Sequence, residues 1–148
     1  AEGQERVPVP TTGLISGGAL PLTVGLGTCL VSPKAVVDQV TAGIDAGYRL
    51  FDTAQRYQNE AGIGTALKKA FARGLAREEV FVTTKIWPAN YGYNKATKSV
   101  RESAEKLGVK AIDLVLPHWP GVATSVEMAS ENARLRKETW RELETLKK

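Results

Sequence analysis

The sequence holds one cysteine, Cys29, and one histidine, His118, among 148 residues. A single cysteine excludes a disulfide within the chain and is typical of a reducing compartment. A structural zinc site needs about four cysteine or histidine ligands, so no metal site is expected. Residues 1–6 are polar and lack a signal-peptide core, and no apolar run approaches the ~20 residues of a membrane helix. These absences predict a cytoplasmic protein.

The sequence also lacks a complete phosphate-binding glycine motif. Gly25 and Gly27 begin like a dinucleotide fingerprint, but Leu30 stands where the third glycine is needed. Gly62 and Gly64 fall inside a predicted helix, and no Gly-Lys-Ser/Thr phosphate loop is present. A Rossmann-type phosphate site is therefore not supported.

Charge of one sign does not gather anywhere along the chain, although the net charge is +4. The positive charges of Lys68, Lys69 and Arg73 are balanced by the negative charges of Glu78 and Glu79 nearby in the sequence. Mixed charge of this kind is typical of a solvated helix face. We therefore expect no nucleic-acid surface and no membrane partner. A hydrophobic content of 43% and a charged content of 24% are ordinary for one globular domain, which we assign to residues 1–148.

Short apolar segments alternate with helical patterns through the middle of the chain. We expect strands at 22–27, 49–52, 80–86 and 112–117, with helices between Ser32 and Gly47, over 59–73, over 94–107 and from 132 onward. In the last helix the apolar face is assigned to Leu135, Trp140, Leu143 and Leu146. Residues 1–20 are expected to form a hairpin or loop, and residues 121–131 a polar loop. This alternation predicts right-handed βαβ units and an α/β fold with a parallel sheet.

Ionisable residues stand at the ends of three of these strands. Asp52, Lys85 and His118 are evenly spaced along the chain, and Tyr57 follows Asp52 in the next loop. If the strands are parallel neighbours, these side chains converge at one edge of the sheet. Taken singly, Lys85 could reach solvent, Asp52 could cap a loop and His118 could be a structural residue.

A lysine beside a tyrosine suggests acid–base chemistry. The ammonium of Lys85 is expected to lower the pKa of Tyr57. Asp52 is expected to keep that ammonium charged and directed toward the phenol. His118 can hydrogen-bond a substrate oxygen. Together these groups can deliver a proton to a carbonyl oxygen as negative charge builds on it.

Four segments that carry these residues resemble the aldo-keto reductase family, namely 25–28, 47–60, 78–87 and 116–120. The resemblance runs from about residue 20 to residue 148. It implies a (β/α)₈ barrel that reduces aldehydes and ketones with NADPH. It further implies that Tyr57 donates the proton, that Lys85 and Asp52 tune it, and that His118 orients the carbonyl group.

The same resemblance places further residues around the ligands. It implies that Gly27, Thr28 and Asp52 lie near the nicotinamide end of the cofactor. It also implies that Cys29, Trp87 and Trp119 surround a small carbonyl substrate. Cysteine at position 29 replaces a bulky aromatic side chain of many relatives, which would widen the pocket.

The length of the chain fits only part of such a barrel. A (β/α)₈ barrel needs ~250 residues, so we expect about four of its eight units, a half-barrel that is poorly active alone. Four strands cannot close a barrel and leave two unpaired edges. The chain also stops without a helix cap, as if cut. We therefore expect self-association or pairing with a complementary C-terminal half.

Two other functions remain open. The chain could be a non-catalytic assembly subunit of the same family, because half of the barrel is missing. It could also be a thiol hydrolase, which would require Cys29 and His118 to form a nucleophile–base pair.

Overall fold

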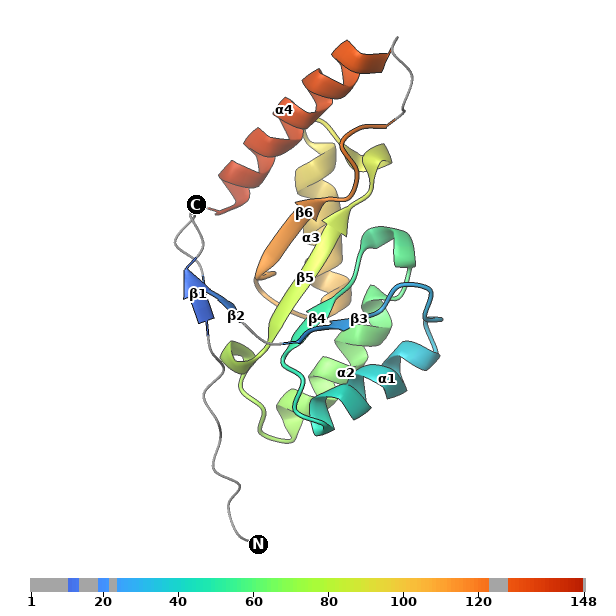
Figure 1. Cartoon of the computed structure of the whole chain (residues 1–148), viewed down its shortest axis with the longest axis vertical. Helices are drawn as coiled ribbons and strands as arrows, with labels where there is room; N and C mark the ends of the chain where they lie inside the picture. The colour runs from blue at the N-terminus through green and yellow to red at the C-terminus, as the bar shows by residue number, and fades with distance from the viewer. Residues whose placement is uncertain (1–10, 14–18, 22–23, 123–127, 148) are drawn as a thin grey trace, which may run out of the picture.

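Four parallel strands form the central sheet of the computed structural model, which describes residues 11–13, 19–21, 24–122 and 128–147. The strands lie side by side in chain order, as Figure 1 shows. They are β3 (Leu26–Gly27), β4 (Leu50–Asp52), β5 (Phe81–Ile86) and β6 (Leu114–Pro117). The predicted α/β arrangement with parallel neighbouring strands is confirmed. The first strand is shorter than expected, and residues 22–23 lie outside the described part.

Three helices connect these strands and lie behind the sheet in the view of Figure 1. They are α1 (Ala35–Asp45), α2 (Glu60–Ala72) and α3 (Lys95–Leu107), and each packs on the next. Three short 3₁₀ turns interrupt the loops: η1 (Gln55–Tyr57), η2 (Arg77–Glu79) and η3 (Pro88–Asn90). A separate antiparallel pair is formed by β1 (Thr11–Gly13) and β2 (Ala19–Pro21). Residues 1–10 and 14–18 of the expected hairpin segment lie outside the described part.

The helix ends follow the sequence signals. The Ser32 hydroxyl accepts a hydrogen bond from the amide of Ala35 at 3.2 Å, which satisfies one free donor at the start of α1. Gly47, after α1, and Gly108, after α3, adopt positive φ angles of 96° and 67°. Glycine reaches this left-handed region without a steric penalty, so both helices can end sharply and return to the sheet.

The apolar core lies between the sheet and the helices. Phe51, Leu67 and Val82 are completely buried there, together with residues of α1 and the end of α3. Burial of each such side chain contributes roughly 1.5–3 kcal/mol. A second apolar cluster surrounds Ile86 and Tyr91. Side chains of the last helix pack against it.

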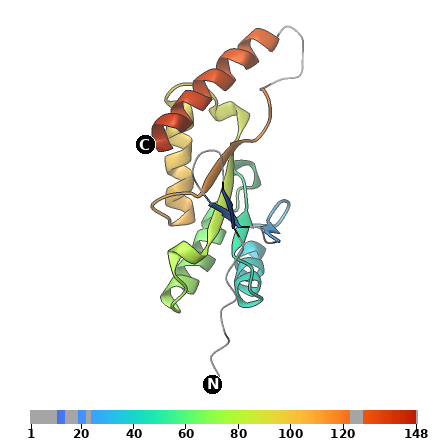
Figure 2. The same cartoon turned by 60° about the vertical axis from the view of Figure 1, so that its left-hand side comes forward.

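The last helix, α4 (Ala129–Lys147), begins three residues earlier than expected. Leu135, Leu143 and Leu146 pack on the second cluster, as predicted. The assignment of Trp140 to this face is wrong, because its side chain is 57% exposed and its indole donates to Glu144. Figure 2 shows α4 crossing one end of α3.

Polar contacts fix α4 against the loop that precedes α3. The buried hydroxyl of Thr139 accepts a hydrogen bond from the amide of Gly92 at 3.0 Å. Glu142 accepts from the amide of Asn94 at 3.2 Å and from the hydroxyl of Thr97. Within the described residues, none of the helices combines the length and the apolar character that crossing a bilayer requires.

Helices α2 and α3 approach each other closely at Gly64. A Cβ atom at this position would collide with the carbonyl oxygen of Lys106 and with the backbone of Leu107. Glycine therefore sets the spacing between α2 and α3.

Candidate active site

Asp52, Lys85 and Tyr57 meet at the carboxyl ends of β4 and β5. Asp52 of β4 lies opposite Thr83 of β5. Lys85 follows on β5, closer to the carboxyl end of that strand. The Lys85 ammonium donates to Asp52 Oδ1 at 2.6 Å and to the carbonyl oxygen of Thr53 at 3.0 Å. Its third contact is the Tyr57 hydroxyl at 3.5 Å. The ammonium is thus held between a carboxylate and a phenol.

His118 joins this group from the next strand. It follows β6 directly, and its amide donates to the carbonyl oxygen of Ile86 at 3.0 Å. Its imidazole lies 5.7 Å from the Tyr57 ring, measured between centroids, with the two planes at 87°. Within the described part of the chain, the buried Nδ1 atom has no hydrogen-bond partner. The structure therefore brings all four predicted catalytic residues together.

The protonation states follow from burial and from the nearby charges. Burial raises the pKa of Tyr57 above its ordinary value and outweighs the lowering effect of Lys85. The lowering effect expected of Lys85 on this pKa is thus present, but burial more than offsets it. Burial and the positive charge of Lys85 lower the pKa of His118, while Asp52 opposes them. At neutral pH the site presents a protonated phenol and a neutral imidazole.

Two indole rings and a thiol border these groups. The Trp87 ring lies 5.5 Å from the His118 ring and 6.3 Å from the Trp119 ring, each time at 87°. Cys29 is exposed, and its thiol interacts with the Tyr57 hydroxyl. The three predicted pocket residues thus lie around Tyr57 and His118. Among the described residues Cys29 contacts Tyr57 rather than His118, so the nucleophile–base pair of a thiol hydrolase is not formed.

The loop after β3 is fixed to β4 by buried hydrogen bonds. The amide and the hydroxyl of Thr28 both donate to the carbonyl oxygen of Asp52 at 3.0 Å. The completely buried Asn59 donates to the carbonyl oxygens of Thr28 at 2.8 Å and Val31 at 3.0 Å, and accepts from Thr53 at 2.9 Å. Asn59 thereby connects the loops that carry Cys29 and Tyr57.

The backbone at Gly27 borders open space. A Cβ atom at Gly27 would meet no other atom within 4 Å, so the backbone there is open to approach. Gly27 lies opposite Asp52 in the sheet, next to the group of ionisable side chains. The open backbone at Gly27 leaves room where the resemblance implies the nicotinamide end of a cofactor. Thr28 is completely buried, and its hydroxyl is already used within the loop.

Gln55 uses its whole amide group to hold the turn that carries Tyr57. Its Oε1 accepts from the backbone amide of Trp87 at 2.9 Å and from Asn90 at 2.8 Å. Its Nε2 donates to Ser99 O and Ser103 Oγ, both at 3.2 Å. One side chain thus joins η1 to the Trp87 segment and to α3.

A second buried group extends this network to β5. Glu60, which is 3% exposed, accepts from Ser103 at 3.3 Å and from Thr84 at 2.7 Å. Thr84 precedes Lys85. The turn of Tyr57 and the strand of Lys85 are therefore connected through polar side chains.

Trp119 is held by a tyrosine that sequence reasoning did not single out. The hydroxyl of the buried Tyr91 donates to the carbonyl oxygen of Trp119 at 2.6 Å and accepts from its amide at 3.1 Å. Gln55, Asn59 and Tyr91 share one property: each contacts a chain segment far away in the sequence. No local pattern reveals such contacts.

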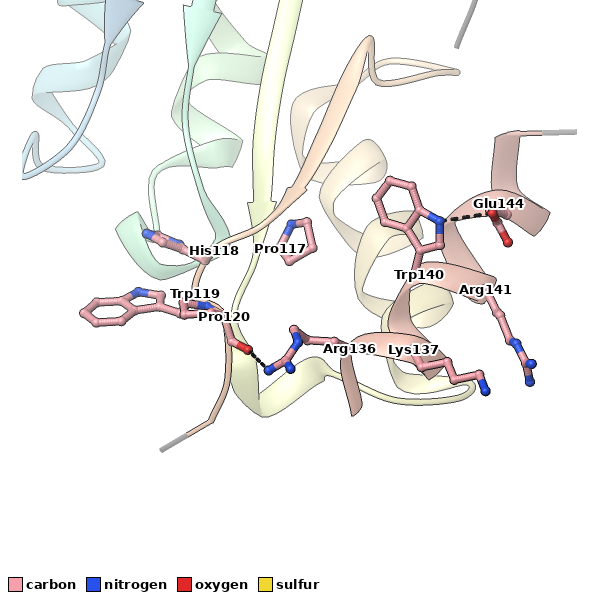
Figure 3. Close-up of a pocket in the computed structure, with 9 residues that line it drawn as sticks. All are labelled: Pro117, His118, Trp119, Pro120, Arg136, Lys137, Trp140, Arg141 and Glu144. Carbon is pink, nitrogen blue, oxygen red and sulfur yellow. Dashed lines mark hydrogen bonds between the residues drawn. The ribbon is translucent and has the colours of Figure 1, made fainter. Parts of the chain in front are cut away.

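A groove of about 610 Å³ lies between the segment after β6 and α4. Figure 3 shows the rings of His118 and Trp119 pointing away from α4, while Trp140 and three basic side chains project from the helix. The basic residues are Arg136, Lys137 and Arg141. This groove therefore borders the candidate site, because His118 and Trp119 line it as well. The described residues contain no group of three or more histidine, cysteine, aspartate or glutamate side chains that could hold a metal ion.

Comparison with known proteins places this geometry in a family. The model of the aldo/keto reductase family matches residues 22–148. Methylglyoxal reductase DkgB of Yersinia pestis is 42% identical over 113 residues, which are 76% of this chain and 41% of that protein.

Solved structures give the same result. An aldo/keto reductase from Brucella melitensis matches with a TM-score of 0.79 and 38% identity, over 95% of this chain and 50% of that one. A Bombyx mori aldo-keto reductase in complex with NADP matches with a TM-score of 0.79 and 35% identity, over 95% and 47%. The chain spans about half the length of these relatives or less, which confirms the predicted half of a barrel of this type. On the evidence of the family match and of the shared fold, the chain belongs to the aldo/keto reductase family.

Proposed function

We propose that the protein reduces aldehydes and ketones to alcohols with NADPH and that Tyr57 donates the proton. The observation that carries the proposal is the grouping of Lys85, Tyr57 and His118, with the ammonium 3.5 Å from the phenol oxygen. Because the chain spans half of its relatives, we propose that the reaction needs a complementary C-terminal half. The chain alone is then poorly active.

Each of these residues has its own role in delivering the proton. His118, neutral at pH 7, hydrogen-bonds the carbonyl oxygen of the substrate and orients it toward Tyr57. Tyr57 then gives its proton to that oxygen. Lys85 stabilises the phenolate that remains, and Asp52 holds the ammonium in place at 2.6 Å.

The cofactor and the substrate occupy opposite parts of this space. We propose that Gly27, Thr28 and Asp52 form the wall near the nicotinamide, with Thr28 acting through the loop backbone that it fixes. NADPH, when bound, supplies the hydride for the carbonyl carbon. Trp87, Trp119 and Cys29 give the substrate side an apolar surface with a thiol in place of an aromatic ring.

The decisive experiment is Tyr57→Phe. With a complementary C-terminal half supplied, the rate of NADPH oxidation with an aromatic aldehyde is expected to fall by about 10²–10⁴-fold, because the only change is the loss of the donor oxygen. Tyr93→Phe is the matched control, since Tyr93 is exposed and its hydroxyl contacts Arg141 on α4. Unchanged activity of the Tyr57→Phe protein would reject the proposed role.

A non-catalytic assembly subunit is a second candidate. One observation favours it: in the described part of the chain β6 pairs only with β5, so its outer edge is open to another strand. A protein that forms a stable complex but oxidises no NADPH with any aldehyde would support this candidate.

A further inference from the structure

The His118 imidazole is held in the site through the backbone rather than by its own Nδ1 atom. That atom is buried and has no hydrogen-bond partner in the described part of the chain. The imidazole meets the rings of Tyr57 and Trp87 edge to face, at centroid distances of 5.7 and 5.5 Å. Since the rotamers open to a side chain depend on its backbone angles, the direction of the imidazole depends on how the chain runs through His118.

Hydrogen bonds fix the peptide planes on both sides of His118. The His118 amide donates to the carbonyl oxygen of Ile86 at 3.0 Å, which fixes the plane before the side chain. The Trp119 amide donates to the Tyr91 hydroxyl at 3.1 Å, which fixes the plane after it. The same hydroxyl donates to the carbonyl oxygen of Trp119 at 2.6 Å. Tyr91 thus controls one of the two backbone angles that direct the imidazole.

The Tyr91 hydroxyl is suited to this double role. Burial raises the pKa of Tyr91 above its ordinary value, although the backbone of Trp119 and of His118 acts in the opposite direction. The hydroxyl therefore keeps its proton at neutral pH and can donate and accept at once. The Trp119 side chain is 52% exposed, so burial of its own ring contributes little to holding this segment.

Tyr91 is itself anchored by the last helix. Its side chain is 2% exposed and belongs to the apolar cluster against which Leu135 and Leu143 of α4 pack. The amide of the next residue, Gly92, donates to the buried hydroxyl of Thr139 on α4 at 3.0 Å. The position of the phenol is therefore set by the packing of α4, and Trp119 follows it.

We propose that Tyr91 is a positioning residue for the carbonyl reduction, and that its hydroxyl directs the His118 imidazole through the backbone of Trp119. This inference rests on the proposed reductase function, in which His118 orients the carbonyl oxygen of the substrate. Tyr91 contacts Trp119 and acts on the reaction only through it. Small errors in such placement matter, because a misplacement of about 1 Å can cost 10²-fold in rate.

Tyr91→Phe tests the proposal, because it removes the hydroxyl and keeps the ring in the core. His118 is the only histidine in the chain, so its imidazole gives a single set of NMR signals. In the variant these signals should shift, and the pKa of His118 should rise toward 6.5, because the released ring moves away from the burial and the Lys85 charge that lower it. Unchanged signals and an unchanged pKa in the folded variant would overturn the proposal.

Tyr93→Phe is the matched control. It removes the same hydroxyl two residues away, from an exposed side chain that contacts Arg141 on α4. The His118 signals should stay where they are, and a shift equal to that in Tyr91→Phe would count against a specific role. If Tyr91→Phe does not fold, Thr139→Val replaces it, because it frees the Gly92 amide from α4. The His118 pKa should then move in the same direction, and an unchanged value would overturn the proposal.

Kinetics separate the role of Tyr91 from the reaction itself. With a complementary C-terminal half supplied, Tyr91→Phe should lower kcat/KM for an aromatic aldehyde by about 10-fold to 10²-fold and leave the KM of NADPH unchanged. An unchanged kcat/KM in an active complex would overturn the positioning role. The NMR spectra need no cofactor and no turnover. If the unaltered complex oxidises no NADPH while Tyr91→Phe displaces the imidazole, the reductase function is rejected and the control of His118 by Tyr91 stands.

Discussion

The Oδ1 atom of Asp52 lies 2.6 Å from the Nζ atom of Lys85, although the two residues belong to different strands. Asp52 is 36% exposed and Lys85 17% exposed, so water screens the pair only in part. The ammonium also donates to a backbone carbonyl oxygen and contacts Tyr57. This ion pair therefore aims the ammonium at the phenol more than it stabilises the fold.

Asp52→Asn is expected to lower the reduction rate by about 10²-fold, because the ammonium loses the charge that holds it beside Tyr57. The free energy of unfolding should change by about 1 kcal/mol or less, as is usual for a partly exposed pair. Activity assays and urea denaturation measure the two effects. Asp45→Asn, which removes an exposed ion pair with Arg73, serves as the control and should leave the rate unchanged.

The dependence of the rate on pH reports the ionisation of Tyr57. Since burial raises the pKa of this phenol above 10.0, the donor stays protonated through the neutral range. Ionisation of Tyr57 should therefore leave the reduction rate unchanged between about pH 7 and 9. The rate should fall only under strongly alkaline conditions. A fall that begins near pH 8 and vanishes in Tyr57→Phe would contradict the raised pKa.

His118 is the only histidine in the chain, so its titration by NMR gives a single set of imidazole signals. Its pKa is expected below 6.5, because burial and Lys85 disfavour the charged ring. Asp52→Asn should lower this pKa further, since Asp52 opposes the shift. Lys85→Met should raise it.

The same shift predicts how stability depends on pH. The unfolded chain takes up the proton first as pH falls through 6.5, so the contribution of His118 to stability is lost between 6.5 and the lower pKa of the folded state. Denaturation of the unaltered chain and of His118→Gln at pH 5 and pH 8 measures this contribution. The same pH dependence in both proteins would argue against it.

Gln55→Leu should loosen the turn that carries Tyr57. The amide of Trp87 and the side chains of Asn90 and Ser103 would lose their partner, at a cost of about 1–3 kcal/mol in the free energy of unfolding. As a positioning residue, Gln55 should also affect kcat more than the KM of the aldehyde. Gln39→Leu is the matched control, because Gln39 Oε1 has no hydrogen-bond partner among the described residues.

The open edge of β6 predicts association. Leu116 on this strand is 38% exposed, and no strand covers its outer side in the described part of the chain. Sedimentation should show dimers or larger species, or a complex when a C-terminal half is supplied. Leu116→Lys should shift the equilibrium toward monomer, whereas Ala89→Lys, which adds the same charge away from the sheet, should not. A monomeric unaltered chain at micromolar concentration would contradict this prediction.

The arrangement of the strands and the convergence of Asp52, Lys85 and His118 could be predicted from the sequence. Parallel strands separated by helices of similar length end at one edge, so the spacing of the three residues was sufficient. The roles of these residues, and of Gly27, Thr28, Cys29, Trp87 and Trp119, are still predictions.

Other features depend on tertiary contacts and could not be predicted. The lowering effect of Lys85 on the pKa of Tyr57 could be predicted, but the larger opposing effect of burial could not, because the sequence does not reveal how far the phenol is buried. Trp140 was misplaced because a helical period of 3.6 residues leaves positions near the edge of an apolar face ambiguous. Gln55 and Asn59 look like ordinary loop residues until their partners on distant segments are known.

The close approach of α2 and α3 at Gly64 has a consequence far from that glycine. Ser99 and Ser103 of α3 hold the amide of Gln55, which in turn fixes the turn of Tyr57. A methyl group on residue 64 would push the two helices apart. We expect the displacement to reach the turn of Tyr57 through the hydrogen bonds of Gln55 to the Ser99 carbonyl oxygen and the Ser103 hydroxyl. The position of the Tyr57 phenol is thus expected to depend on a contact between two helices outside the candidate site.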